Sequence, residues 1–255
     1  EAPLESWTLI DEHNGSSYSQ NIDTTVMPNG VVYVVAKIYD AVGNFTYSPK
    51  QRYMCDNQGP EQVKNVKCIA VDGTTATLSW SDVSDDDISY FVVECKQSDG
   101  VWKSVSRTST NLGVNLSGLT PEHDYVYRVI GYDKRSNRGT PSEEITVTTL
   151  KDTICPKVTK ITPDPGYFKS EINLRFTAED DYRVKSIEIQ TSTDKESWKT
   201  VSEIKATGES AKCTFDCKLD LKNYEEGSVF VRAKVYDSYG NVTENKDLTC
   251  YEYVV

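Results

Sequence analysis

The sequence predicts an all-β protein, for two reasons. Its 255 residues include 16 Tyr and only 2 Met, and Val, Ile and Thr are also abundant, a mixture that favours pleated, half-buried strands over helices. Apolar and polar residues alternate with a period of two in many segments, and no segment keeps apolar residues at helical spacing for three turns.

An internal repeat indicates how the chain is divided. Residues 31–46 read VVYVVAKIYDAVGNFT and residues 228–243 read SVFVRAKVYDSYGNVT. Further upstream, Glu5-Ser6-Trp7 matches Glu196-Ser197-Trp198 at a shorter offset. Loop-length variation between strands accounts for that difference, so we treat both matches as one repeat.

The first copy of the repeat is incomplete. Residues 1–58 are expected to be the C-terminal half of the Ig-like β-sandwich that is complete at 151–255, truncated from a longer array. No part of residues 1–58 corresponds to the strands expected within residues 158–191 of the complete copy. Half a sandwich cannot cover its own core. We therefore expect an incompletely covered face, unless another segment supplies strands, at Val32, Val34, Ala36 and Ile38.

Between the two copies, residues 59–150 are expected to form a different domain. The segments 56–60 and 151–156 are short, turn-rich linkers, and each ends in a proline that stiffens the entry to the next strand. Linkers this short predict tandem sandwiches arranged as a rod.

The middle segment carries the most specific motif. Leu119, Pro121 and Tyr125 form a Leu-x-Pro-x-x-x-Tyr run before an alternating strand. This is the pattern of a tyrosine corner, in which the phenol bonds back to upstream backbone. Together with Trp80 and Tyr127, the run resembles a fibronectin type III domain over residues 60–150. The resemblance implies the sandwich fold, which hosts many functions.

That family's usual recognition sequences are absent from the chain. There is no Arg-Gly-Asp and no Trp-Ser-x-Trp-Ser. The candidate recognition loop reads DKRSNRG, at residues 133–139.

The flanking segments resemble bacterial Ig-like repeats. The residues that carry this resemblance are Ala178–Asp181, Ser186–Gln190, Thr193–Trp198 and Asp237–Asn241. Alternation of such units with fibronectin type III-like ones is similar to large secreted or wall-attached proteins of Firmicutes. Those include multidomain glycoside hydrolases and surface proteins with Rhs/YD repeats.

The sequence Asp-x-x-Gly-Asn occurs at Asp40–Asn44 and at Asp237–Asn241. We predict a tight hairpin turn between the last two strands at both, because Asp bonds backbone two residues on and Gly and Asn tolerate positive φ. The alternative is a calcium site in which Asp180, Asp181 and Asp237 converge at one end of the sandwich. Calcium takes six to eight oxygens, and these residues supply only a few.

Other polar motifs have simpler interpretations. Asp85-Asp86-Asp87 is interpreted as a solvated loop, with a cation or a basic partner as the alternative. Four Asn-x-Ser/Thr sequences begin at Asn14, Asn44, Asn115 and Asn241. Two of these four simply end the Gly-Asn turns, and so the fold explains them without glycans.

The seven cysteines cannot all pair within the chain. Cys213 and Cys217 would lie on one face of a strand about 13 Å apart, beyond the reach of a disulfide. Buried free thiols are therefore expected at Cys55, Cys68, Cys95, Cys155, Cys213, Cys217 and Cys250.

No residue is assigned a catalytic, cofactor-binding or metal-binding role, and the chain is expected not to be an enzyme. His13 and His123 are isolated, and neither a Gly-x-Ser-x-Gly nor a phosphate loop occurs. Trp80 is interpreted as core, Trp7 and Trp198 as equivalent packing residues, and Trp102 stays open. Exposed, coplanar rings would instead indicate carbohydrate binding.

The formal net charge of −11 argues against nucleic acid and anionic membranes as partners. No stretch is long enough to insert in a membrane. We expect non-catalytic spacer or presentation modules of a multidomain extracellular or cell-surface protein, with neighbouring domains as partners. The alternatives are an adhesion module for a carbohydrate or protein ligand, and accessory domains packed on a glycoside hydrolase or Rhs/YD-type protein.

Overall fold

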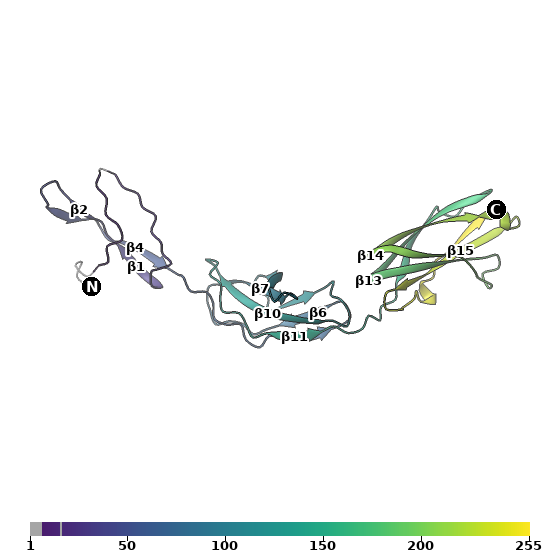
Figure 1. The fold of residues 1–255 in the computed structure, drawn as a ribbon, viewed down its shortest axis with the longest axis horizontal. Helices are drawn as coiled ribbons and strands as arrows, with labels where there is room; N and C mark the ends of the chain where they lie inside the picture. Colours follow the sequence, from purple (N-terminus) through teal and green to yellow (C-terminus); the bar gives the residue numbers. More distant parts are fainter. Residues whose placement is uncertain (1–6, 16) are drawn as a thin grey trace.

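The protein is all-β, as the alternation predicts. The structure, a computed structural model, describes residues 7–15 and 17–255. Three groups of strands follow one another along the long axis, from the purple N-terminal group to the yellow C-terminal end (Figure 1). Residues 1–6 of the predicted first domain, with Glu5 and Ser6 of the repeat, lie outside the described residues. In the described ranges, no helix is long and apolar enough to cross a membrane.

The N-terminal group is two separate antiparallel pairs of strands. In one pair, β1 (Gly30–Val34) lies beside β4 (Gln51–Cys55). In the other, β2 (Lys37–Tyr39) lies beside β3 (Phe45–Tyr47). Figure 1 shows β1 and β4 side by side, with β2 on a separate hairpin further from the middle group.

The apolar side chains of this group are poorly covered. Ile38 is 54% exposed and Ala36 is exposed, while Val32 and Val34 are only half-buried. Most of the large exposed hydrophobic side chains among the described residues also lie before residue 59. The expectation of an incompletely covered face is confirmed for these four residues.

The two copies of the repeat show what the missing strands do. In the C-terminal copy, residues 228–237 form one continuous strand, β15, which pairs with a neighbour on each side. In the N-terminal copy, the equivalent residues are divided into β1 and β2. There β1 pairs with β4 alone, so the sequence forms the long strand only where hydrogen-bonding partners exist on both edges.

The middle group consists of two sheets that share one core. The sheets have the orders β5-β6-β9 and β11-β10-β7-β8. Buried side chains from both, such as Leu78, Phe91 and Val129, pack together between them. The strands are β5 (Lys67–Val71), β6 (Ala76–Ser79), β7 (Ile88–Lys96), β8 (Trp102–Thr108), β9 (Gly113–Leu116), β10 (Asp124–Asp133) and β11 (Ile145–Thr148).

The predicted tyrosine corner is present in this group. The backbone N–H of Thr120 donates to Tyr125 Oη at 2.8 Å. The phenol therefore accepts from upstream backbone and holds the loop against the start of β10.

Replacing Tyr125 with phenylalanine should destabilise the middle group by about 1–3 kcal/mol, because the half-buried Thr120 N–H loses its acceptor. Denaturant unfolding measures the change. The matched control is Tyr90→Phe, since the Tyr90 ring stacks on Tyr132 and its hydroxyl makes no hydrogen bond within the described part of the chain. That variant should shift stability by less than about 0.5 kcal/mol. Equal losses in the two variants would contradict the corner's role.

The C-terminal group is built on two long, bent strands. Its elements are β12 (Lys157–Thr162), β13 (Glu171–Ser192), β14 (Lys199–Asp220), η2 (Leu221–Asn223), β15 (Ser228–Asp237), η3 (Asn245–Asp247) and β16 (Cys250–Val254). The register of β13 shifts between Glu179 and Val184. Before this corner β13 pairs with β12, and after it with β15. The two halves of β13 thus pair with different strands, β12 and β15. The C-terminal group has a hydrophobic core that is separate from the core of the middle group.

Candidate functional site

Each linker is held by an asparagine of the group that follows it. Asn137 Nδ2 donates to the carbonyl oxygen of Asp56 at 3.0 Å. Asn241 Nδ2 donates to the carbonyl oxygen of Asp152 at 3.2 Å. The same contact therefore occurs at both places where one group gives way to the next, and we call these places the first and the second junction.

Both asparagines end a turn of one kind, and a third copy begins at Asp40. In each turn one carboxylate oxygen of the aspartate accepts from backbone N–H groups two and four residues on, and the other accepts from the asparagine amide. The residue before the asparagine has positive φ in every case: 93° at Gly43, 69° at Ser136 and 92° at Gly240.

The Asp-x-x-Gly-Asn pattern predicted two of these turns but not the third, at residues 133–137. The signal was Tyr-Asp-x-x-x-Asn, which all three share, but Ser136 replaces the glycine there. Asp40–Asn44 joins β2 to β3, so the predicted hairpin turn is present there, but β4 follows and these are not the last two strands of the group. Asp237–Asn241 closes only on an isolated bridge between Tyr236 and Val242, and β16 begins later, so a hairpin between the last two strands is wrong there.

Further contacts cross the second junction. Thr74 Oγ1 donates to Asp181 Oδ2 at 2.9 Å, and Tyr239 Oη donates to the carbonyl oxygen of Pro121 at 3.2 Å. Gly73 lies so close to the linker that a Cβ on it would be 3.0 Å from the Cα of Asp152. Two loops of the middle group thus rest directly on the linker and on the C-terminal group.

Three carboxylates gather at each junction. In each set, carboxylate oxygens of three aspartates lie within 4.8 Å of one another: one from the linker, one that begins an Asp–Asn turn, and a third from the loop before β7 at the first junction or from the corner of β13 at the second. The sets are Asp56, Asp87 and Asp133 at the first junction, and Asp152, Asp180 and Asp237 at the second.

The two sets differ in how their charge is balanced. At the first junction Arg135 Nε lies 3.3 Å from Asp56 Oδ2. At the second, burial raises the pKa of Asp180 to about 6, and Asp152 and Asp181 add to the shift. Burial also raises the pKa of Asp152. Repulsion from the carboxylates of Asp181, Asp237 and Asp72 raises it further. Like charges and desolvation act in the same direction here.

The calcium site considered from the sequence required Asp180, Asp181 and Asp237 to converge, and only two of these three do so. Asp180 and Asp237 do converge, but Asp181 turns instead to Thr74. The linker residue Asp152 takes its place. Asp152 was missed because nothing in a linker's sequence tells which loops will fold against it.

The interpretation of Asp85-Asp86-Asp87 as a solvated loop is wrong for two of its residues. Asp85 is half-buried and its Oδ2 accepts the backbone N–H of Glu61 at 2.8 Å. Asp87 is half-buried in the first-junction set. Only Asp86 is exposed. The loop helps to seat the first linker, which gives its acidic residues a structural role.

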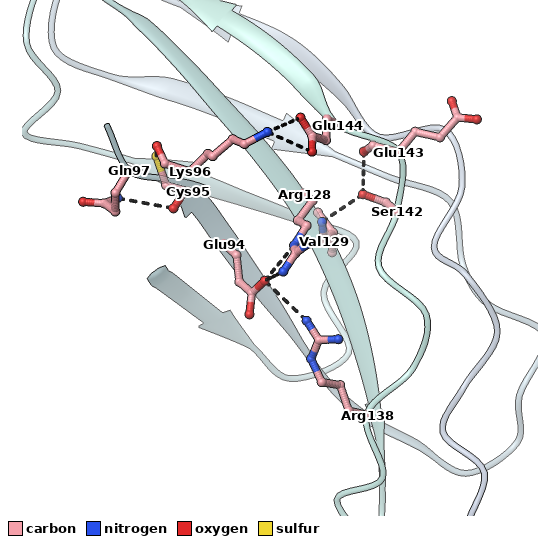
Figure 2. Close-up of polar contacts among 10 residues, drawn as sticks. All are labelled: Glu94, Cys95, Lys96, Gln97, Arg128, Val129, Arg138, Ser142, Glu143 and Glu144. Atoms are coloured by element: carbon pink, nitrogen blue, oxygen red, sulfur yellow. Dashed lines mark hydrogen bonds and ion pairs between the residues drawn. The ribbon is translucent and has the colours of Figure 1, made fainter. Parts of the chain in front are cut away.

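Trp102, left open by the sequence, lies under cations on the outer face of the four-stranded sheet. The Arg128 guanidinium lies 4.0 Å from the ring centroid and Lys96 Nζ lies 5.5 Å from it. Figure 2 shows how Arg128 is held in turn, by Glu94, which also binds Arg138, and how Lys96 pairs with Glu144. A sugar would have to displace this network to stack on the ring.

The rings of the other three tryptophans also contact an aromatic or cationic side chain. Trp80 is buried and packs edge-on against Phe91 at 5.6 Å, which agrees with its interpretation as core. The equivalent residues Trp7 and Trp198 each lie under a cation, from Lys50 at 5.5 Å and Arg232 at 3.9 Å.

The two histidines are engaged with aromatic rings. His13 stacks on Tyr18 at 4.7 Å and His123 meets Tyr125 edge-on at 4.8 Å. Within the described ranges neither ring is hydrogen-bonded to a serine or cysteine side chain, as a nucleophile–base pair requires. The non-enzyme expectation stays a prediction.

The cysteines and sequons can also be placed. All seven thiols are free, but only Cys55 and Cys95 are buried, so the expectation of burial is wrong for the other five. Asn44 and Asn241 use their amide nitrogens inside the Asp–Asn turns. The fold therefore accounts for these two sequons, as expected.

Comparisons with known proteins find a family match for the middle group. Residues 61–148 match the model of the fibronectin type III domain. Similar solved structures include a fibronectin type III domain of human fibronectin type III domain containing protein 3, at 25% identity, covering 38% of this chain and 93% of that one with a TM-score of 0.35. The FN1–FN3 domains of chicken CNTN1 are 15% identical, covering 77% and 67% at a TM-score of 0.35.

The FN5 domain of Drosophila Lar is 21% identical, covering 36% and 99% at a TM-score of 0.31. All three TM-scores are below 0.5, and so the family match alone carries the assignment of residues 61–148. No curated protein matches the chain. The resemblance of the flanking groups to bacterial Ig-like repeats stays a prediction.

Proposed function

We propose that this chain is a semi-rigid run of non-catalytic modules that spaces or presents other domains of an extracellular or cell-surface protein. Its units are a partial Ig-like sandwich at 1–58, the fibronectin type III unit at 59–150 and an Ig-like sandwich at 151–255. The source we favour is a large secreted or wall-attached bacterial protein.

The repeated junction is the observation that carries this proposal. Each linker carbonyl is fixed by the asparagine of the following turn, at 3.0 Å and 3.2 Å. Side-chain contacts from Thr74 and Tyr239 add to the second junction. The same hydrogen bond at both junctions restricts how each unit can reorient relative to the next, which freely reorienting units would not need. Fixed junctions between small units are what a spacer requires.

The covered tryptophan rings favour a spacer over a sugar-binding module. Stacking platforms need exposed ring faces, whereas Trp102 and Trp198 each have an arginine within 4.0 Å of the ring centroid. Presentation of a neighbouring domain needs no such surface.

Small-angle scattering on the full chain tests the proposal. A compact protein of 255 residues has a radius of gyration of roughly 18 Å. We expect a clearly larger value and the skewed pair-distance distribution of an elongated particle. A radius near the compact value would contradict a spacer. The complete reading frame supplies an independent check, because a spacer requires further domains beside these.

A further inference from the structure

The three aspartates of the second junction come from three separate segments. Asp152 belongs to the linker, Asp180 lies at the corner of β13, and Asp237 ends β15. Their carboxylate oxygens lie within 4.8 Å of one another. Such proximity of three acids is unfavourable unless something positive lies among them.

Two of the three carboxylates each have an oxygen to which no described residue donates a hydrogen bond. Asp152 is 1% exposed; its Oδ1 accepts the Ile154 N–H at 2.9 Å, while its buried Oδ2 has no hydrogen-bond partner. Asp180 Oδ2 accepts from Tyr182 and Arg183, while its Oδ1 is likewise buried and unpaired. Buried charged oxygens without partners are rare in folded proteins, where they are paired or bind metal.

The third carboxylate is held in place and retains free acceptor capacity. Asp237 is fully buried, with Oδ1 accepting from Tyr239 and Asn241 N–H and Oδ2 accepting only from the Asn241 amide. A carboxylate oxygen has two lone pairs. Asp237 Oδ2 therefore has a further position for a ligand.

The first junction offers an internal comparison. Its three aspartates are equally close, but Arg135 already pairs with Asp56. None of its carboxylate oxygens is buried without a partner among the described residues. The second junction also brings three carboxylates within 4.8 Å of one another, but no ion pair between them and a Lys or Arg is found among residues 7–15 and 17–255.

We propose that Asp152, Asp180 and Asp237 bind a calcium ion that fastens the linker to the C-terminal group. Calcium prefers oxygen ligands at about 2.3–2.6 Å, so two ligands of one ion lie up to roughly 5 Å apart. Three carboxylates from separate segments, a linker, a strand corner and a strand end, suit the flexible coordination of calcium better than the strict octahedron of magnesium. The set has no Cys or His, which zinc prefers. The site goes beyond the spacer function and does not depend on it.

Calorimetric titration of the chelator-treated full chain with calcium chloride tests this site. We expect one saturable site, and a thermal transition raised by about 5 °C or more when free calcium exceeds the dissociation constant about a hundredfold. Asp152→Asn should weaken binding at least about tenfold, since it removes a charged ligand. The matched control is Asp56→Asn, the equivalent change at the first junction, which should leave calcium affinity unchanged.

The stability of the metal-free Asp152→Asn protein separates lost binding from lost folding. Asparagine keeps an Oδ1 for the Ile154 N–H and removes one of the repelling charges, so this variant should melt at or above the temperature of the metal-free parent. Absence of a saturable calcium signal would overturn the proposal. So would undiminished binding by Asp152→Asn, an equal loss in Asp56→Asn, or magnesium binding of equal affinity. Scattering tests the spacer separately, so either idea can fail without the other.

Discussion

Replacing Phe91 with alanine is expected to lower the melting transition of the middle group strongly, while the C-terminal group keeps its own melting transition. Phe91 is fully buried and packs edge-on against Trp80. Removing such a ring costs about 3–5 kcal/mol, a large share of the roughly 5–15 kcal/mol that stabilises a domain. The loss should remain local because the two cores share no residue. Differential scanning calorimetry resolves the two transitions.

Phe176→Ala is the matched variant in the other core. Phe176 is also fully buried, within the cluster that includes Ile189 and Val231. It should lower only the C-terminal transition, by a similar amount. If both transitions moved together in either variant, the two groups would be one folding unit and the proposed domain boundaries would be wrong.

The second large effect is expected from Gly59→Ala at the first junction. A Cβ on Gly59 would lie 2.3 Å from the backbone carbon and oxygen of Arg138 and 2.6 Å from the nitrogen of Gly139. Backbone atoms cannot rotate away as a side chain can, so the linker must leave its place. We expect a loss of about 2–3 kcal/mol in the middle unit, at the upper end of the overpacking range.

Gly208→Ala is the control for this change. An added Cβ at Gly208 meets no heavy atom within 4 Å, and the backbone there does not have positive φ. Its stability should be unchanged or slightly higher. Chemical denaturation compares the two variants, and scattering should show a looser first junction for Gly59→Ala alone. A neutral result for Gly59→Ala would mean that the linker does not pack on Arg138 in solution.

Much of the fold could be predicted because its signals are local. The interpretation of Trp80 as a core residue is confirmed, because this side chain is only 6% exposed. The Leu-x-Pro-x-x-x-Tyr run predicted the hydrogen bond between Thr120 and Tyr125. The missing strands of the first repeat predicted the exposure of Ile38. The first two predictions needed only residues within one strand or one loop, and the third needed the comparison of the two copies of the repeat.

The two wrong or missing predictions have different physical origins. Asp85 and Asp87 would be solvated in an isolated loop, but here Glu61 and the first-junction carboxylates lie against them, so distant segments decided that case. The third Asp–Asn turn is closed by local hydrogen bonds from Asp133, and the glycine pattern did not predict it because Ser136 adopts the positive φ that was expected of glycine.

The sequence by itself determined the all-β class, the pattern of buried faces and the turns that aspartate and asparagine close. Those features follow from side-chain alternation and from hydrogen bonds between residues at most a few positions apart. Only the tertiary structure decided that Asp152 meets Asp180 and Asp237. That meeting depends on the corner in β13 and on how a linker enters the following sheet, which are properties of packed strands and of no single segment.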